Sequence, residues 1–488
     1  MAYGEQRSVN SFYHLKDIDI KKTYCRCLAC FVAKKLNPNC YNKALQEKAI
    51  VYNLGRAYCA PESGADKERP AIAIKSKFGV VLDRIVNSNV KALKSYCAIG
   101  GFTALNKTLL MKPRNVIAEI ESSGLRGRGG AGFFTGKKWL SVFSQASEKK
   151  FVIVNADEGD PGAYIDRLIL EEDPFCIIEA ATIAAYTVGA QMGIIYVRKE
   201  YPEAQEVLQR AIEEAYAAGF LGKNILSKSF DFDLNLLSGH GSYLCGEETS
   251  LLNAIEARRP EVRARPPYPS EHGLFDAPTL VNNVETLANI PWIINNGGQA
   301  FYALGFAKSR GTKCVSLNSL FNRPGLYEVD FGISVRQILE DIGGGLRTSE
   351  PKGVIIGGPL AGVIPPNLFD TTFGFEELTA IGASVGHGGV IAFDQSSSIA
   401  ELLHHVFLFG AFESCGKCTP CRLGTREIEE HFRKIINKEA IAKDSYKKIG
   451  CIIDALKYTS LCAHGSGLAD FALSIMRYYA EEYKKCFE

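Results

Sequence analysis

Three cysteines in the C-terminal part of the chain have a spacing that can bind a metal cluster. Cys415, Cys418 and Cys421 form the pattern C-x₂-C-x₂-C, which lets one loop present three thiolates to one iron–sulfur cube. For the fourth ligand, Cys462 lies in a turn-like segment that can face a loop, whereas Cys451 lies in an apolar helical run and is predicted to be packed. Four thiolates also suit structural zinc, but three closely spaced cysteines with a distant partner favour a [4Fe–4S] cluster.

A glycine-rich stretch at residues 124–139 can bind a phosphate. Six of its sixteen residues are glycine and four are basic, so exposed backbone N–H groups and cations lie together. Gly127, Gly129 and Gly132 also satisfy G-x-G-x-x-G, but that dinucleotide fingerprint requires a strand before it. Residues 113–124 instead show helical spacing of apolar side chains. We therefore predict a phosphate cradle of another kind.

A short apolar strand at 151–154 runs into a polar turn. Asn155, Asp157, Glu158 and Asp160 follow the strand, interrupted by glycine and proline, which is typical of a binding turn. The alternative is an acidic turn on the surface. The nearby glycine-rich stretch favours the binding turn.

Two further segments offer polar groups. Tyr243, Gly246, Glu247 and Glu248 form one compact block, whose carboxylates suit the hydroxyls of a ribose or of a ribityl chain and repel a 2′-phosphate. Asn282, Asn283 and Thr286 add amides and a hydroxyl. The loop 263–269, with arginines, prolines and a tyrosine, is either a clamp for adenine and phosphate or an ordinary proline-rich linker.

The elements that position these groups fall into distinct regions. Predicted helices at 177–188 and 202–218 alternate with strands at 151–154 and 194–197, which indicates an α/β unit. Residues 310–398 combine short β runs with one helix at 335–342 and resemble a β-grasp domain, and 400–488 are helical. In the N-terminal part, 51–53 and 71–74 are predicted strands of a small α/β unit.

The N-terminal region also holds Cys25, Cys27, Cys30, Cys40 and Cys59. The first three are dense enough for a metal site, but no short-spaced pair completes a four-ligand set. Free thiols are therefore favoured over a cluster, and the sequence leaves the choice open.

Composition excludes several classes of protein. The chain has 488 residues, 46% hydrophobic and 23% charged, with a net charge of +2, so nothing indicates binding to nucleic acid or to an anionic membrane. The first residues lead to no apolar segment and no run approaches about 18 apolar residues, so we expect neither a signal peptide nor a membrane-spanning helix. We expect a cytoplasmic protein, in which many of the fifteen cysteines serve metal or redox sites.

Together the motifs resemble those of the flavoprotein subunit of complex I. The same motifs occur in the diaphorase subunits of NAD-linked hydrogenases and of soluble NAD-dependent formate dehydrogenases. The match covers about residues 100–470 and rests on 124–139, 155–162, 239–251, and 413–425 with Cys462. The segments 173–175, 357–361 and 385–389, and Asp160 in place of the glutamate of complex I, look more similar to formate dehydrogenase β subunits.

This resemblance implies a set of cofactor ligands. FMN would lie over the glycine stretch and NADH would stack on the flavin, with Phe133 and Tyr243 flanking it, Glu158 and Asp160 near the nicotinamide, and Glu247 and Glu248 against ribose hydroxyls. No protein acid or base is needed, because the cofactors carry out the hydride transfer. The implied FMN and NAD(H) ligands are Gly127, Arg128, Gly129, Gly130, Phe133, Lys138, Asn155, Asp157, Glu158, Asp160, Tyr243, Gly246, Glu247, Glu248, Asn282, Asn283 and Thr286. The implied [4Fe–4S] ligands are Cys415, Cys418, Cys421 and Cys462.

The resemblance also implies a multidomain α/β fold. Residues 1–95 would form a degenerate thioredoxin-like domain, 96–308 an FMN- and NADH-binding α/β domain, 309–398 a ubiquitin-like β-grasp domain, and 399–488 a helical [4Fe–4S] bundle. In the first of these, Cys25 and Cys30 resemble the first ligand pair of a [2Fe–2S] module. The second pair would fall near Asn53 and Ala57, so that cluster is predicted to be lost.

The implied function is that of a diaphorase subunit within a larger complex. Hydride passes between NAD(H) and FMN, and single electrons pass to or from the [4Fe–4S] cluster. The expected partners are a small [2Fe–2S] thioredoxin-like subunit and a molybdenum or tungsten formate dehydrogenase subunit with further clusters. An NAD-linked hydrogenase, bifurcating or not, and complex I are the alternatives.

Overall fold

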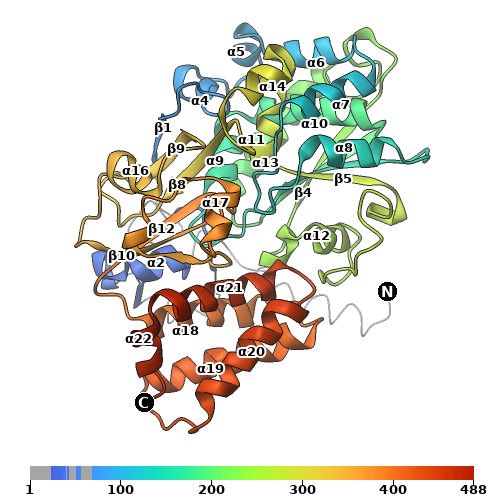
Figure 1. Cartoon of the computed structure of the whole chain (residues 1–488). Helices are drawn as coiled ribbons and strands as arrows, with labels where there is room; N and C mark the ends of the chain where they lie inside the picture. The colour runs from blue at the N-terminus through green and yellow to red at the C-terminus, as the bar shows by residue number, and fades with distance from the viewer. Residues whose placement is uncertain (1–22, 40, 43–50, 57–68) are drawn as a thin grey trace.

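The centre of the molecule is a four-stranded parallel sheet. The computed structural model describes residues 23–39, 41–42, 51–56 and 69–488 (Figure 1). The sheet order is β4 (Asp233–Ser238), β3 (Met192–Val197), β2 (Phe151–Ala156) and β5 (Thr279–Asn283), with every neighbouring pair parallel. Because parallel strands end at one edge of a sheet, the polar residues that follow β2 and those that close β5 lie close together.

Helices cover both faces of this sheet. On one face α10 (Pro174–Val188), apolar and almost fully buried, packs against β2. On the other, Leu251 and Leu252 of α12 (Glu248–Ile255) pack with Ile153 and Val281 of the strands. Alternate residues of β2 thus face opposite layers, as buried parallel strands require. The helices α7 (Pro113–Ser122), α8 (Thr135–Phe143) and α11 (Pro202–Ala217) complete the layers.

A second sheet has six strands in a mixed arrangement. Its order is β1 (Ala71–Ile74), β9 (Gly325–Asp330), β8 (Thr312–Leu317), β12 (Gly389–Asp394), β10 (Pro351–Ile356) and β11 (Val363–Ile364). The β8–β9 pair is an antiparallel hairpin and β12 runs parallel to β8, so the first and last strands that the 309–398 region contributes to this sheet are neighbours, as in a β-grasp fold. The helical segment at 335–342 follows β9, beginning with α16 (Val335–Gln337).

Strand β1 corrects one expectation. Residues 71–74 do form a strand, but it pairs in parallel with β9, not within a separate N-terminal sheet. Val51 makes only an isolated bridge to Cys25. Cys40, Ala57 and Cys59 lie outside the described residues, and the predicted domain boundaries remain predictions.

The C-terminal region is a helical bundle, drawn in red in Figure 1. It comprises α18 (Ile399–Phe412), α19 (Thr425–Ile436), α20 (Ser445–Thr459), α21 (Ala463–Tyr478) and α22 (Ala480–Lys485). The predicted α/β, β-grasp and helical regions are therefore confirmed. No helix among the described residues is long and apolar enough to cross a membrane.

Shorter elements connect these layers. They are α2 (Leu28–Val32), α4 (Asp83–Asn87), α5 (Leu93–Ala98), α6 (Thr103–Thr108), α9 (Ile165–Glu172), α13 (Val284–Ala288), α14 (Ile290–Asn296), α15 (Gly298–Tyr302), α17 (Phe375–Ala380), β6 (Gly305–Phe306) and β7 (Ser309–Arg310). Of these, α2, α9 and α13 lie next to the groups discussed below.

Candidate functional site

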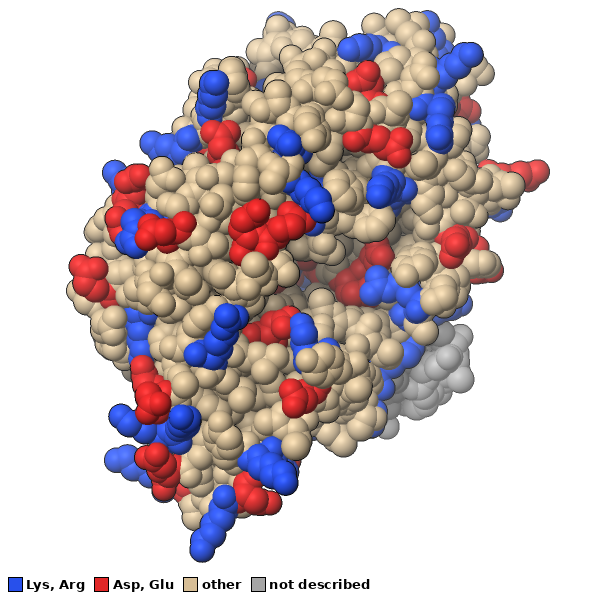
Figure 2. Space-filling view, in the orientation of Figure 1, with Lys and Arg blue, Asp and Glu red and all other residues tan. Residues whose placement is uncertain are grey.

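The sequence motifs meet in one cavity of about 760 Å³. Its walls come from the glycine-rich stretch, the ends of β2 and β5, the segment 243–248, residues 384–387 before β12, and the start of α21. In Figure 2 the surface is hollowed near the centre, and acidic and basic side chains lie side by side there. A cavity of this size, at the carboxyl edge of a parallel sheet, is typical of a cofactor site.

Nearly all the expected FMN and NAD(H) ligands line this cavity. They are Gly127, Gly129, Gly130, Phe133, Lys138, Asn155, Asp157, Glu158, Asp160, Tyr243, Gly246, Glu247, Glu248, Asn282, Asn283 and Thr286. Arg128 is the exception. Its backbone N–H donates to Thr286, but its buried guanidinium donates to the carbonyl of Arg310 and lies 4.9 Å from the ring centre of Phe331. The Arg128 side chain therefore packs against Arg310 and Phe331 and holds the loop in place without lining the cavity.

Backbone geometry explains the glycines of the loop. The chain enters it from helix α7 and leaves it into helix α8, so the context of a dinucleotide fingerprint is absent, as predicted. A Cβ on Gly129 would lie 2.8 Å from Cβ of Asn283, whereas one on Gly130, whose φ is +136°, would meet only open space. Glycine thus lets the backbone form the wall of the cavity.

Orphaned polar atoms show that the cavity suits a polar ligand. Within the described part of the chain, Oγ1 of Thr135 and Oδ2 of Asp157 are buried without a hydrogen-bond partner, and both residues line the cavity. Thr135 opens helix α8, whose first turn also favours an anion. A ligand with hydroxyls and a phosphate, such as FMN, fits this donor set.

The two carboxylates that follow β2 in the sequence, those of Glu158 and Asp160, have different partners. Glu158 accepts the N–H groups of Ile165, Asp166 and Arg167 and so caps α9; burial raises its pKa to about 7. Asp160 accepts a hydrogen bond of 2.7 Å from the hydroxyl of Tyr243, and burial raises its pKa. Glu158 therefore shapes the cavity wall, while Asp160 fixes the Tyr243 ring.

The adjacent glutamates are also unequal. Glu247 caps α12 by accepting the N–H groups of Thr249 and Ser250. Glu248 accepts from Lys138 at 2.9 Å and from Arg265 at 3.2 Å. Burial opposes ionisation of Glu248, but these two cations lower its pKa. The carboxylate of Glu248 thus stays charged at the cavity wall and pairs with the two cations beside it.

Two lining residues were not assigned a role from the sequence. Asp166 and His387 both line the cavity, and with Glu158 they form a compact buried group. Their only sequence signal is a charged residue at the start of a helix and a histidine among glycines.

The four expected cluster ligands converge below the cavity. Cys415 and Cys462 pack around Leu244 and Val262, and burial, with the nearby sulfurs of Cys418, Cys462 and Cys415, raises the pKa of Cys421 to about 12. No three of these four sulfurs lie within 4.8 Å of one another, whereas one zinc ion would hold them about 4 Å apart. The wider spacing fits an iron–sulfur cube.

Cys451 is exposed on α20, so the expectation that it is packed is wrong. Cys462 is the N-cap residue of α21 and also lines the cavity, together with His464. The buried His464 contacts the carbonyl of Gly410 at 2.8 Å, in agreement with a packed histidine. One of the four expected cluster ligands, Cys462, therefore lies in the wall of the cavity.

Comparison with known proteins agrees with this geometry. Residues 120–292 match the family described as the Nuo51 FMN-binding domain, and 401–486 match the NADH-ubiquinone oxidoreductase-F iron-sulfur binding region. The HndC subunit of the NADP-reducing hydrogenase of Solidesulfovibrio fructosivorans is 40% identical over 81% of this chain and 82% of its own length. An NADH-quinone oxidoreductase F subunit of Rhizobium meliloti is 39% identical over 80% of this chain and 93% of its own.

The chain belongs to the family of NADH-quinone oxidoreductase F subunits. A solved structure of an NAD⁺-reducing [NiFe]-hydrogenase superposes with a TM-score of 0.83 at 26% identity, over 99% of this chain and 87% of that one. The family resemblance, the FMN cofactor and the [4Fe–4S] cluster predicted from the sequence are confirmed. This family member is thus an FMN-dependent oxidoreductase of the NADH dehydrogenase type, and the relatives it matches are subunits of larger complexes.

Proposed function

We propose that this chain exchanges electrons with NAD(H) as the flavin subunit of a soluble, cytoplasmic NAD-linked complex. The observation that carries the proposal is that Cys462 lines the same cavity as the glycine-rich stretch and the acidic block. Bound FMN supplies both hydride exchange with NAD(H) and single-electron exchange with the cluster. Because a proposed cluster ligand lies in the cavity wall, the distance that single electrons cross between flavin and cluster would be short.

The proposed FMN ligands come from the glycine-rich stretch, the start of α8 and the ends of β2 and β5. Backbone N–H groups at Gly129 and Gly130 and the first turn of α8 would hold the phosphate. Asn155, Asp157 and Asn282 would hydrogen-bond polar groups of the flavin. Asn155 and Asn282 are held by Gly246 and Trp139, respectively, so these amides are fixed before the cofactor binds.

NADH is proposed to bind against Phe133, Tyr243 and Glu248, which also line the cavity. Phe133 is 54% exposed although it lines the cavity, which suits a ring that stacks on an incoming aromatic ligand. Tyr243 is fixed by Asp160, and Glu248 accepts ribose hydroxyls. These side chains bind, orient and exclude water, and none transfers a proton.

The proposed partners are a small [2Fe–2S] thioredoxin-like subunit and a molybdenum or tungsten formate dehydrogenase subunit. The segments 173–175, 357–361 and 385–389 support formate dehydrogenase. The second candidate is a hydrogenase, supported by the similarity to the hydrogenase subunit and to the hydrogenase structure.

Two measurements test the proposal. The full chain, purified without oxygen, should show a flavin spectrum and reduce ferricyanide with NADH; a protein that takes up no flavin contradicts the FMN assignment. Metal analysis of the native complex then separates the partners. Molybdenum or tungsten supports formate dehydrogenase, and nickel or a hydrogen-evolving iron centre supports hydrogenase instead.

A further inference from the structure

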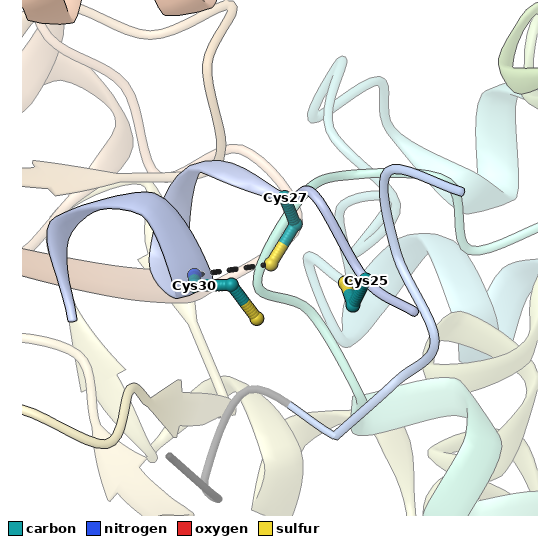
Figure 3. Close-up of side chains that lie close together, drawn as sticks. All are labelled: Cys25, Cys27 and Cys30. Atoms are coloured by element: carbon teal, nitrogen blue, oxygen red, sulfur yellow. Dashed lines mark hydrogen bonds between the residues drawn. The ribbon is translucent and has the colours of Figure 1, made fainter. Parts of the chain in front are cut away.

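A second cysteine group lies outside the flavin and cluster site. Cys25, Cys27 and Cys30 bring their three sulfurs within 4.8 Å of one another. In Figure 3, Cys27 and Cys30 at the start of α2 face Cys25, which lies on the adjoining stretch of chain. Metal–thiolate bonds of about 2.3 Å place the sulfurs around one ion about 4 Å apart. The group therefore has the dimensions of a single-ion site.

Local structure holds the three thiols in place. Cys27 is the N-cap residue of α2, and its sulfur accepts the N–H of Cys30 at 3.3 Å. Cys25 is held by its bridge to Val51. The side chains of Cys27 and Cys30 are buried, whereas Cys25 is partly exposed. The site is thus formed before an ion arrives.

The surroundings argue against a [2Fe–2S] cluster here. Such a cluster needs four protein ligands, and among the described residues no fourth cysteine joins the group. Asn53, at one position expected for the missing pair, donates to the carbonyls of Glu158 and Ala163 and accepts the N–H of Gly55. The side chain of Asn53 is therefore hydrogen-bonded to the loop beside the flavin cavity.

We propose that Cys25, Cys27 and Cys30 bind one soft metal ion, Zn²⁺, through three thiolates. Three sulfurs select zinc over hard cations, and the fourth position, beside the partly exposed Cys25, takes a water. The role is structural. Phe31 of α2 stacks on His405 at 4.4 Å, and Lys34 pairs with Glu401 at 2.8 Å, so the ion fixes this segment against α18, which leads to Cys415.

The test uses the full chain loaded with FMN and its iron–sulfur cluster. After exposure to Zn²⁺ alone and removal of excess, the wild type should retain about one zinc per chain, with about three sulfur neighbours by X-ray absorption. Cys27→Ser should weaken zinc retention about tenfold or more, while flavin and iron contents stay unchanged. The control Cys97→Ser, at an exposed cysteine of α5, should bind zinc as the wild type does.

Equal zinc retention by the wild type and Cys27→Ser would overturn the proposal, as would no retention by the wild type. A disulfide among the three cysteines in protein prepared without oxygen would overturn it too. Where Cys27→Ser does not fold, Cys25→Ser at the more exposed position takes its place, and loss of the thiolate-to-metal absorption of added Cd²⁺ is the readout. Flavin and iron contents report separately on the proposed function.

Discussion

Nε2 of His387 lies 3.0 Å from Oδ2 of Asp166. The same carboxylate oxygen accepts a hydrogen bond of 2.6 Å from the amide of Asn283, and Nδ1 of His387 lies 3.5 Å from Glu158. One imidazole thus lies between two buried carboxylates, where the loop before β12, the first turn of α9 and the end of β5 meet. Protonation of His387 stabilises this junction of the two sheets beside the cavity.

The first prediction concerns pH. Burial alone would lower the pKa of His387, but the carboxylates of Asp166 and Glu158 outweigh it and the opposing charge of Lys313, and the pKa rises to about 9. This pKa exceeds the unfolded value of about 6.5, so the protonated His387 contributes at most about 3 kcal/mol to the free energy of unfolding. The contribution is fully present below about pH 6.5 and is lost as the pH rises to about 9. His387→Gln should therefore flatten the fall of Tm between pH 7 and 9.

The pH range isolates this histidine, because Glu158, with a pKa of about 7, is largely ionised above it. His272→Gln is the matched control, since that ring is exposed and pairs only locally with Asp276. It should keep the pH dependence of the wild type. An equally steep fall in His387→Gln would show that the junction does not depend on the proton.

The second prediction concerns the choice of nucleotide. Glu248→Ala removes the carboxylate that Lys138 and Arg265 share and leaves Arg265 only its longer contact of 3.7 Å with Glu247. The two cations then attract a 2′-phosphate more strongly, and ribose hydroxyls lose an acceptor. We expect the ratio of kcat/KM for NADPH over NADH to rise about tenfold, since a charged hydrogen bond is worth about 1.5 kcal/mol. Glu439→Ala, which removes an exposed partner of Arg433, should leave the ratio unchanged. The same ratio in Glu248→Ala would refute its ribose role.

The third prediction separates the two candidates for the fourth cluster ligand. Cys462→Ser should lose the iron of the cluster and its electron paramagnetic resonance signal after reduction, because three thiolates hold a cube poorly. Cys451→Ser should keep both, because Cys451 is exposed on α20. Retention of a full cluster in Cys462→Ser would mean that another residue completes the site.

The sequence predicts those parts of the site whose signal is local. In three segments a few consecutive residues are enough to indicate the function: the glycine stretch, the polar turn after β2 and the C-x₂-C-x₂-C loop. Cys451 was misplaced although a signal was present. Ile449, Ile453 and Leu456 are buried on one stripe of α20, at helical spacing, and this stripe leaves position 451 on the other face.

Other parts depend on contacts between distant segments. Residues 71–74 have the composition of a strand, but no local pattern states that the partner is β9, more than 250 positions away. His387 and Asp166 are separated by 221 residues, and a charge at the start of a helix usually serves only that helix. Only the packing of the two sheets brings these groups together.

The last prediction concerns the ion pair that joins the two sheets. Lys313 of β8 donates to the carboxylate of Glu285 on α13, and both side chains are fully buried. Nζ of Lys313 also donates to the carbonyl of His387 at 2.7 Å. Lys313→Met should destabilise the chain by about 3–5 kcal/mol, because Glu285 is left charged and unpaired in the interior.

A double variant shows whether the ion pair itself stabilises the fold, or whether the chain is destabilised only when one of the two charges is removed and the other stays buried. Replacing both charges, in Lys313→Met with Glu285→Leu, removes the desolvation of two ions along with their attraction, so we expect most of the lost Tm to return. Lys223→Met, which breaks an exposed pair with Asp231, should leave Tm unchanged. If the double variant is as unstable as Lys313→Met, the fall in Tm comes from the lost hydrogen bond between Lys313 and the loop of His387. The unpaired carboxylate is then not its cause. The Tm of FMN-loaded protein would then fall together with flavin retention, because that loop lines the cavity.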